Sequence, residues 1–421
     1  MRNQFVVVGF VFIVFIVLVD SYTFRGISRL TEGLSKTNNL IIQGIFMLVS
    51  LILIAFIIYL MIKNVKLGYE GVMEYTKFLM AYFVLFYVPK LFFVVFLLVR
   101  DLILLGNKIF TAFSSGAASS PSELFISRAD FLLQMGIVVA AIPFISIIFG
   151  IWKGRYNYKV ERVSLSFKNL PSSFNGLKII QISDLHLGSF GKDSSKLRNA
   201  IDIINSLEAD YVLFTGDIVN NIASEMEVFI PELSRIKAKN GKYSILGNHD
   251  YGTYYQWPTE DALKQNMDDL YRFHEEAGFH LLRNNSVVLE RGEAKIALIG
   301  VENWGLPPFP QYGNLKVAME DVEDINFKIL MSHDPSHWDA VVLPESDIDL
   351  TLSGHTHGMQ FAIKIPGWRW SPVKFKYPRW AGIYEQDNRY LYVNIGLGYI
   401  AFPGRVGTPP EITLFTLNTT H

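Results

Sequence analysis

The sequence predicts a membrane protein in two parts, with four apolar helices followed by a layered α/β domain. Two observations predict the helices. Half of the 421 residues are hydrophobic and the mean hydropathy is positive, which is more apolar than an ordinary soluble globule, and the longest apolar stretches all precede residue 155. A third observation predicts the domain: from residue 160 onward, short β-branched runs alternate with polar amphipathic stretches.

The apolar stretches have the length scale of membrane-spanning helices, which need about 20 residues. The first stretch also suits the core of a signal peptide, but no small-residue cleavage pattern precedes Arg25, which favours an uncleaved anchor. We therefore expect a transmembrane region over 1–155 and a second domain over 156–421. The expected spans are about 5–19, 40–62, 78–99 and 131–152.

Lysine and arginine placement predicts the orientation of these spans. If all four cross the membrane, the basic residues of 63–77 and those of 153–162 lie on the same side, and these are the denser basic connections. We therefore expect the N-terminus and the second domain in the cytoplasm. Lys90, beside Pro89 in the third stretch, is costly inside a bilayer. Either it snorkels or faces a neighbouring helix, or it marks a functional site; if its stretch did not span, the orientation would reverse.

The second domain shows the pattern of an α/β fold. Leu197, Ile201, Ile204 and Leu207 recur at helical spacing between the first two expected strands, which predicts a β-α-β opening. The later part is rich enough in strands to favour two packed sheets over one. The expected strands are 178–183, 210–215, 242–246, 295–300, 327–332, 349–353, 390–395 and 412–417.

Composition excludes several classes of function. The chain has no cysteine, which excludes disulfides, thiolate metal sites and thiol nucleophiles, so any metal must be held by His, Asp, Glu or Asn. Its formal net charge is −1, and no part of it resembles a basic nucleic-acid-binding domain. We therefore expect no nucleic acid partner.

Side chains able to bind metals follow five of the expected strands at the point where each strand ends. Open α/β sheets build their sites at these carboxyl ends. Each motif alone is weak, because a single histidine at a strand end is more often packed than ligated. Five of the nine histidines nevertheless fall in these segments. The motifs are SDLH at 183–186, GD at 216–217, GNHD at 247–250, HD at 333–334 and GHTHG at 354–358.

This ordered set resembles the calcineurin-like metallophosphoesterases. The longer segments ISDLHLG, TGDIV, GNHDYG, SGHTHG and a late GLG…PEITL are most similar to the membrane-associated bacterial branch. That branch includes phosphodiesterases and UDP-2,3-diacylglucosamine pyrophosphohydrolases. The resemblance covers about 160–417 and implies a four-layer α-β-β-α sandwich with two facing sheets. One departure is Met359, where relatives often have a second glycine, and it bears on the shape of the pocket.

The resemblance also implies roles for individual residues and a cofactor of two divalent metal ions. A donor set of nitrogen and oxygen without thiolate suits Mn, Fe or Zn better than Mg or Ca. Two such ions, ~3.5–4 Å apart, generate hydroxide and clamp the phosphoryl oxygens. One ion would be held by Asp184, His186 and His357, and the other by Asn248, His333 and His355, with Asp217 bridging both. His249 would protonate the leaving group, with Asp250 orienting it.

The function implied is hydrolysis of phosphodiester or pyrophosphate bonds by a metal-activated hydroxide at the inner face of a membrane. A lipid-linked substrate is favoured over a soluble nucleotide because of the four spans. The alternative is a catalytically weak scaffold or regulatory domain attached to a membrane sensor or transport unit. Lost ligands would mark a scaffold, whereas all seven are present.

Two further features each allow two interpretations. The segment 368–380 is crowded with Trp, Tyr, Phe, Lys and Arg, which suits either a membrane–water interface or a long loop packed by its own aromatic residues. Arg405, in a late glycine-rich segment, either meets a phosphate or forms a structural salt bridge.

Overall fold

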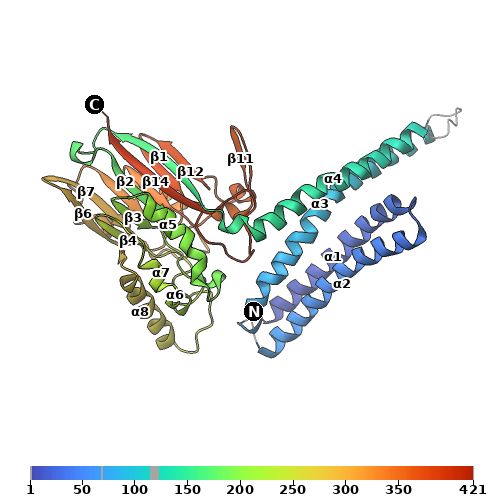
Figure 1. Cartoon of the computed structure of the whole chain (residues 1–421), viewed down its shortest axis with the longest axis horizontal. Helices are drawn as coiled ribbons and strands as arrows, with labels where there is room; N and C mark the ends of the chain where they lie inside the picture. Colours follow the sequence, from blue (N-terminus) through green and yellow to red (C-terminus); the bar gives the residue numbers. More distant parts are fainter. Residues whose placement is uncertain (1, 68–69, 114–122, 421) are drawn as a thin grey trace. The chain divides into compact units, whose positions relative to one another are not determined.

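The computed structural model describes residues 2–67, 70–113 and 123–420 of the chain. It divides into two units, Met1–Phe149 and Gly150–His421 (Figure 1). The division falls a few residues before position 155, where the composition changes.

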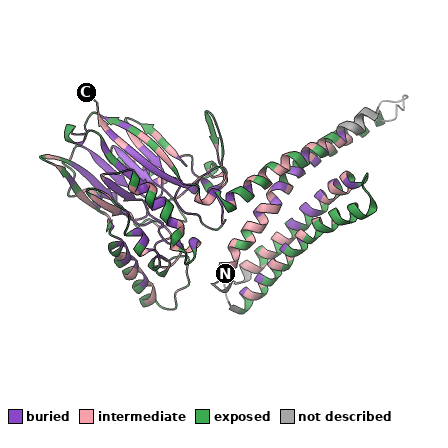
Figure 2. Cartoon of the chain, in the orientation of Figure 1, coloured by how far each residue is buried: buried purple, intermediate pink, exposed green. Residues whose placement is uncertain are grey.

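The first unit consists of long apolar helices. In the described residues, four helices are long and apolar enough to cross a membrane, and each expected span lies within one of them. Many of their aliphatic and aromatic side chains are exposed (Figure 2), as lipid-facing surfaces require. The helices are α1 (Arg2–Thr31), α2 (Lys36–Leu67), α3 (Glu70–Phe113) and α4 (Glu123–Trp152).

Lys90 is paired inside this unit. Its Nζ lies 2.6 Å from Asp20 Oδ1 of α1 and 3.1 Å from Ser50 Oγ of α2. Tyr87 donates a hydrogen bond of 2.7 Å to the other carboxylate oxygen of Asp20. The structure therefore matches the interpretation in which Lys90 faces neighbouring helices, and the pairing offsets the cost of a charge in a low-dielectric surrounding.

The second unit is built on two six-stranded sheets, and all eight expected strands are present in them. Strands β2 to β5 run parallel in the first sheet, and β7, β8, β9 and β13 run parallel in the second. The first sheet has the order β1 (Lys159–Phe167), β14 (Glu411–Thr419), β2 (Leu177–Ile182), β3 (Tyr211–Phe214), β4 (Gly241–Ser244), β5 (His280–Leu281). The second has the order β12 (Gly382–Gln386), β13 (Arg389–Val393), β9 (Leu350–Ser353), β8 (Lys328–Met331), β7 (Ala294–Gly300), β6 (Asn285–Arg291).

Side-chain alternation along the strands builds the four layers that the family resemblance implies. In β2, Ile179 lies between the sheets, in the cluster that contains Leu298 and Leu352 of the second sheet. Its neighbour Ile180 packs on the outer face, in the cluster that contains Ile201 of α5 (Arg198–Ser206). Helix α8 (Glu260–Glu276) also covers that face, and α9 (Leu315–Met319) contributes to the outer cluster of the second sheet. The buried colouring of Figure 2 follows the sheets.

The elements that sequence reasoning missed are short, polar or at sheet edges. β5 has two residues, and β1, β6 and β12 are largely half-buried or exposed, so their apolar signal is weak. A separate antiparallel hairpin, β10 (Ile363–Ile365) with β11 (Trp368–Trp370), begins before the aromatic segment and enters it.

The ion pair of the membrane unit can be tested by substitution. Lys90→Met leaves the Asp20 carboxylate buried without its cation, which should cost about 3–5 kcal/mol of stability. The full-length protein in detergent should then unfold at a lower temperature. The double variant Lys90→Met/Asp20→Asn should recover most of the loss, and Lys66→Met, at an exposed position of α2, should change little. A double variant as unstable as Lys90→Met would contradict the pairing.

Candidate metal centre

Strand ends from both sheets meet at one site. The segments after β2, β3 and β4 in the first sheet and after β8 and β9 in the second carry the expected metal ligands. Gln181 of β2 donates a hydrogen bond of 2.8 Å to the carbonyl of Ser353 in β9, which joins the two sheets beside the site. Parallel strands present their carboxyl ends at the same edge, so the packing of two such edges gathers residues that lie far apart in the sequence.

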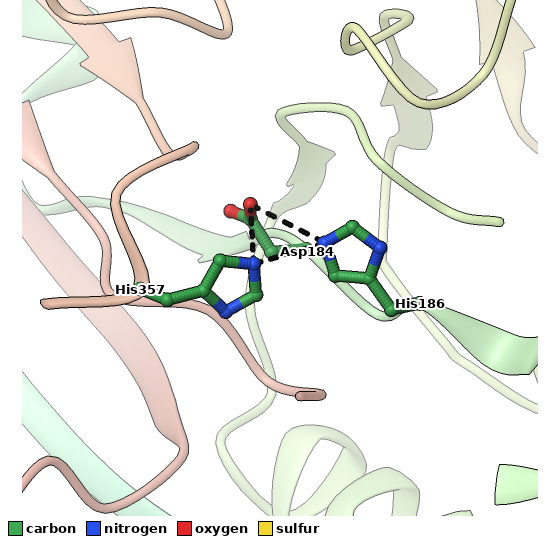
Figure 3. A group of neighbouring side chains, drawn as sticks. All are labelled: Asp184, His186 and His357. Carbon is green, nitrogen blue, oxygen red and sulfur yellow. Dashed lines mark hydrogen bonds and ion pairs between the residues drawn. The ribbon is translucent and has the colours of Figure 1, made fainter. Parts of the chain in front are cut away.

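The first group of side chains is Asp184, His186 and His357 (Figure 3). All three are buried, and their potential ligand atoms lie within 4.8 Å of one another. His357 Nε2 is 3.2 Å from Asp184 Oδ1 and 2.9 Å from His186 Nε2. The structure thus brings together the three residues that the resemblance assigns to one metal.

The second group is Asp217, His333 and His355. Asp217 Oδ2 lies 3.2 Å from His333 Nε2 and also 3.5 Å from His186 Nε2 of the first group. His355 Nδ1 is 3.3 Å from His333 Nε2. Asp217 therefore contacts both groups, which is the placement that a bridging ligand requires.

Hydrogen bonds on the outer side of His333 and Asn248 leave one ligand atom of each free to face the site. His333 Nδ1 donates to the carbonyl of Thr215 at 2.7 Å, which leaves Nε2 for the site. Asn248 Nδ2 donates to the Tyr254 hydroxyl at 2.9 Å, while its Oδ1 is buried and has no hydrogen-bond partner among the described residues. Oriented imidazoles with a buried, unpartnered amide oxygen fit divalent cations.

His355 is oriented by a residue that sequence reasoning missed. The Tyr377 hydroxyl lies 2.7 Å from His355 Nε2 and donates to Asp334 Oδ2 at 3.4 Å. His355 Nε2–H therefore donates to Tyr377, and Nδ1 is left to face His333. Asp334 belongs to the HD motif after β8, but nothing in the sequence pattern connects Tyr377 to it, because Tyr377 lies in the aromatic segment.

The backbone at the site is strained. Asp184, His186, Asp217, His355 and His357 all have φ between 48° and 72° in the left-handed region, which residues other than glycine seldom adopt. Such conformations cost of order 1–3 kcal/mol each and cluster at functional sites, where the surrounding structure enforces them.

Two glycines of the sequence motifs allow the carboxylates to approach the neighbouring loops. A Cβ at Gly247 would lie 2.2 Å from Asp217 Oδ1, and a Cβ at Gly354 would lie 2.3 Å from Asp184 Oδ2. Neither position can carry a side chain without displacing a carboxylate. The glycines of GNHD and GHTHG are therefore part of how the site is built.

The buried carboxylates attract positive charge strongly. Burial opposes ionisation of Asp184, yet His357 holds the pKa of that carboxyl well below its usual range. Burial by itself lowers the pKa of the His333 imidazole. The negative charge of the adjacent Asp217 has the larger effect and raises this pKa to about 10. Without a metal this imidazole keeps a proton, so cations that bind here must displace it.

The structure places the Asp250 carboxylate against backbone amides of the two neighbouring loops. Its carboxylate accepts hydrogen bonds from the backbone amides of Gly247 and Asp217, each at 2.8 Å, and of Ile218 at 2.9 Å. It thereby holds the two loops together, and in the part of the chain that the structure describes its hydrogen bonds go to backbone amides and not to the His249 ring. That ring is oriented by the carbonyl of Asn220, 2.7 Å from His249 Nδ1. Adjacent residues in a tight turn point in different directions, so the two side chains meet different partners.

Among the residues that the structure describes, Arg405 makes neither of the two expected contacts. Its side chain is 2% exposed, which leaves no surface for a phosphate. It donates to the carbonyls of Gly398 at 2.7 Å and Ile395 at 2.9 Å, and it lies 3.2 Å from His357 Nδ1. Arg405 therefore supports the loop behind the first group.

Comparison with known proteins identifies both parts of the chain. Residues 2–155 match the family described as "Probable Calcineurin-like phosphoesterase, transmembrane domain". Residues 177–359 match the family described as "Calcineurin-like phosphoesterase", and this range contains every expected metal ligand.

Related proteins agree with this assignment. An uncharacterized metallophosphoesterase of Bacillus subtilis, YkuE, is 32% identical over 255 residues, covering 60% of this chain and 82% of its own. A "transmembrane protein with metallophosphoesterase domain" of Danio rerio is 27% identical over 308 residues, covering 71% of this chain and 66% of its own. A metallophosphoesterase structure from Sphaerobacter thermophilus is 18% identical over 53% of this chain and 78% of its own, with a TM-score of 0.26, too low to support an argument. The chain belongs to the calcineurin-like metallophosphoesterases, a family of phosphoester hydrolases, and carries the transmembrane domain of its membrane-associated members.

Proposed function

We propose that this membrane protein hydrolyses phosphodiester or pyrophosphate bonds of a lipid-linked substrate at a dinuclear metal site. The observation that carries the proposal is Asp217, whose carboxylate contacts both groups of buried ligands. A scaffold that had lost its activity would have no need for two complete, strained and mutually oriented ligand groups.

The residues would divide between two cations. Asp184, His186 and His357 would hold one, Asn248, His333 and His355 the other, and Asp217 would bind both. Their donor atoms favour Mn, Fe or Zn. When bound, two such cations lower the pKa of water and neutralise charge on a phosphoryl group.

His249 would act as the acid for the leaving group. It is half-buried, and its ring centroid lies 4.9 Å from that of His186, beside the first ligand group. Because Nδ1 is bound to the Asn220 carbonyl, Nε2 is the nitrogen available to donate a proton to a departing oxygen. Its backbone N–H donates to Asp217 Oδ1 at 2.8 Å, which fixes the acid relative to the shared ligand.

The membrane side of the proposal is supported by the four helices and by the charges between them. The basic connections favour a second unit that faces the cytoplasm, at the inner surface of the membrane. A substrate embedded in that surface would reach a tethered enzyme without diffusing through solution.

Two substitutions separate metal binding from proton donation. Asp217→Asn removes the shared ligand and should lower both the bound metal, measured by mass spectrometry, and turnover. His249→Asn should retain the metal but lose turnover by about 10²–10⁴-fold. His280→Gln, at an exposed position in β5, is the matched control and should behave like the wild type. Turnover that survived in both site variants would refute the assignment.

Tyr377→Phe tests the orientation of His355. Removing the hydroxyl takes away the hydrogen bond to Nε2 and should weaken metal affinity by about 10–100-fold. Excess manganese should then restore turnover, which a general folding defect would not allow. Tyr312→Phe, which removes a hydroxyl at an exposed position, should leave the manganese dependence unchanged. An unchanged metal affinity in Tyr377→Phe would show that Tyr377 does not position this ligand.

The substrate class can be tested with the full-length protein in detergent and manganese. A phospholipid, a lipid-linked nucleotide diphosphate and a soluble aromatic phosphodiester would be compared by release of product. We expect a chelator to abolish turnover and the lipid-linked compounds to have the highest kcat/KM. A preference for the soluble ester would contradict the lipid-linked part, while activity on none would contradict the proposal itself.

A further inference from the structure

The hairpin β10–β11 stands apart from both sheets. It pairs Ile363 with Trp370 and Ile365 with Trp368, and Pro366 and Gly367 form its turn. It projects from the second unit as a narrow ribbon (Figure 1). A two-stranded hairpin is marginally stable by itself, so its exposed surface suggests contact with something further.

One face of the hairpin is entirely apolar. Side chains alternate along each strand, and the register places Ile363, Ile365, Trp368 and Trp370 on one face, with Lys364 and Arg369 on the other. Ile363 is 52% exposed, Ile365 55% and Trp368 50%, and the hairpin is mostly coloured as exposed in Figure 2.

Phe375 extends this apolar surface. Its side chain is 82% exposed, and its ring centroid lies 6.4 Å from that of Trp370. We call the surface formed by Ile363, Ile365, Trp368, Trp370 and Phe375 the apolar hairpin face. A continuous exposed apolar patch of this kind marks a site that contacts a partner or a membrane.

The charge around the apolar hairpin face suits an anionic membrane. The stretch 359–380 contains five Lys and Arg residues and no Asp or Glu. Two of its cations are paired with other segments, Lys364 with Glu161 at 3.6 Å and Arg379 with Asp339 at 2.9 Å. Trp beside Lys and Arg is the composition of the membrane–water interface, where each basic residue near anionic lipid contributes about 1 kcal/mol.

The course of the chain favours a bilayer over a protein partner. The hairpin is linked to β1 through the pair of Lys364 and Glu161. Strand β1 begins at Lys159, only a few residues after α4 ends at Trp152. The hairpin therefore belongs to a part of the chain that follows directly on a helix able to cross a membrane.

The base of the hairpin is joined to the metal ligands. Ser371 Oγ donates to the carbonyl of Gly358 at 2.8 Å, and Thr356 Oγ1 donates to the carbonyl of Trp380 at 2.7 Å. Both bonds attach the hairpin and the segment after it to the GHTHG loop. Met359, directly after that loop, is also exposed.

We propose that the apolar hairpin face inserts into the acyl boundary of an anionic leaflet and holds the metal site at the membrane surface. Exposed Lys374 and Lys376, on either side of Phe375, contact lipid phosphates, and the apolar residues of the face replace their contact with water by contact with acyl chains. Insertion of the hairpin is independent of catalysis. The further role of the hairpin, bringing a lipid-linked substrate to the metal site, rests on the function proposed above.

The absence of cysteine from the chain allows a direct test of insertion. Ile365→Cys in the full-length protein would carry an environment-sensitive fluorophore, and Val288→Cys, 39% exposed in β6 at the opposite edge of the second sheet, is the matched control. Both would be reconstituted in vesicles of phosphatidylcholine and phosphatidylglycerol containing acyl-chain nitroxide lipid. We expect a blue shift and strong quenching at position 365 and neither at 288.

Two results would overturn insertion. One is equal quenching at the two positions. The other is a label at 365 that is shielded from aqueous iodide in detergent but not quenched by nitroxide lipid, which would indicate a protein partner or a second copy. The measurement requires no activity, so it stands even if the proposed reaction fails.

A second experiment tests substrate presentation. The variant Ile365→Ser/Trp368→Ser should show a several-fold loss of turnover on a phosphodiester lipid in vesicles and unchanged turnover on a soluble phosphodiester. An equal loss on both substrates would show that the hairpin supports the site itself, and would overturn its role in presentation.

Discussion

Two buried carboxylates, Asp184 and Asp217, impose the constraint on which the rest of the second unit depends. Each is at most 1% exposed, and an uncompensated buried charge costs several kcal/mol. Imidazoles surround them, and backbone amides of neighbouring loops donate to them, such as His355 N–H to Asp184 and His249 N–H to Asp217. The left-handed backbone at the ligands and the bare glycines opposite the carboxylates are the geometric consequences of packing so many polar groups around two negative charges.

Residues behind the expected metal ligands hold the ligand side chains and their loops in place, each through different hydrogen bonds. Asp250 ties the loop after β3 to the loop after β4 through backbone amides. Tyr377 and Asp334 orient His355, while Arg405 fills the space behind His357 with hydrogen bonds to carbonyls. His355 and His357 are therefore oriented by neighbouring residues of the chain itself, which organises this part of the site without a cation.

In the membrane unit, too, a buried charge is compensated by neighbouring side chains of the chain itself. Lys90 is matched by a single carboxylate, Asp20, with Ser50 and Tyr87 completing the hydrogen bonds. This pair is neutral and needs no ion. At the candidate metal centre, by contrast, the positive charge beside Asp217 is a proton on His333, which a bound cation can displace. One arrangement stabilises a helix bundle, and the other creates a binding site.

The sequence by itself determined the membrane spans, the eight principal strands and the set of side chains at their ends. These follow from local periodicity, because burial repeats every second residue in a strand and parallel strands place their ends at one edge. The edge strands and the hairpin lacked that apolar signal. Only the tertiary structure decided that Asp20 pairs with Lys90 across 70 residues, that Tyr377 orients His355, and that Asp250 braces two loops. Such contacts depend on the directions of individual side chains and on distant packing, which periodicity does not encode.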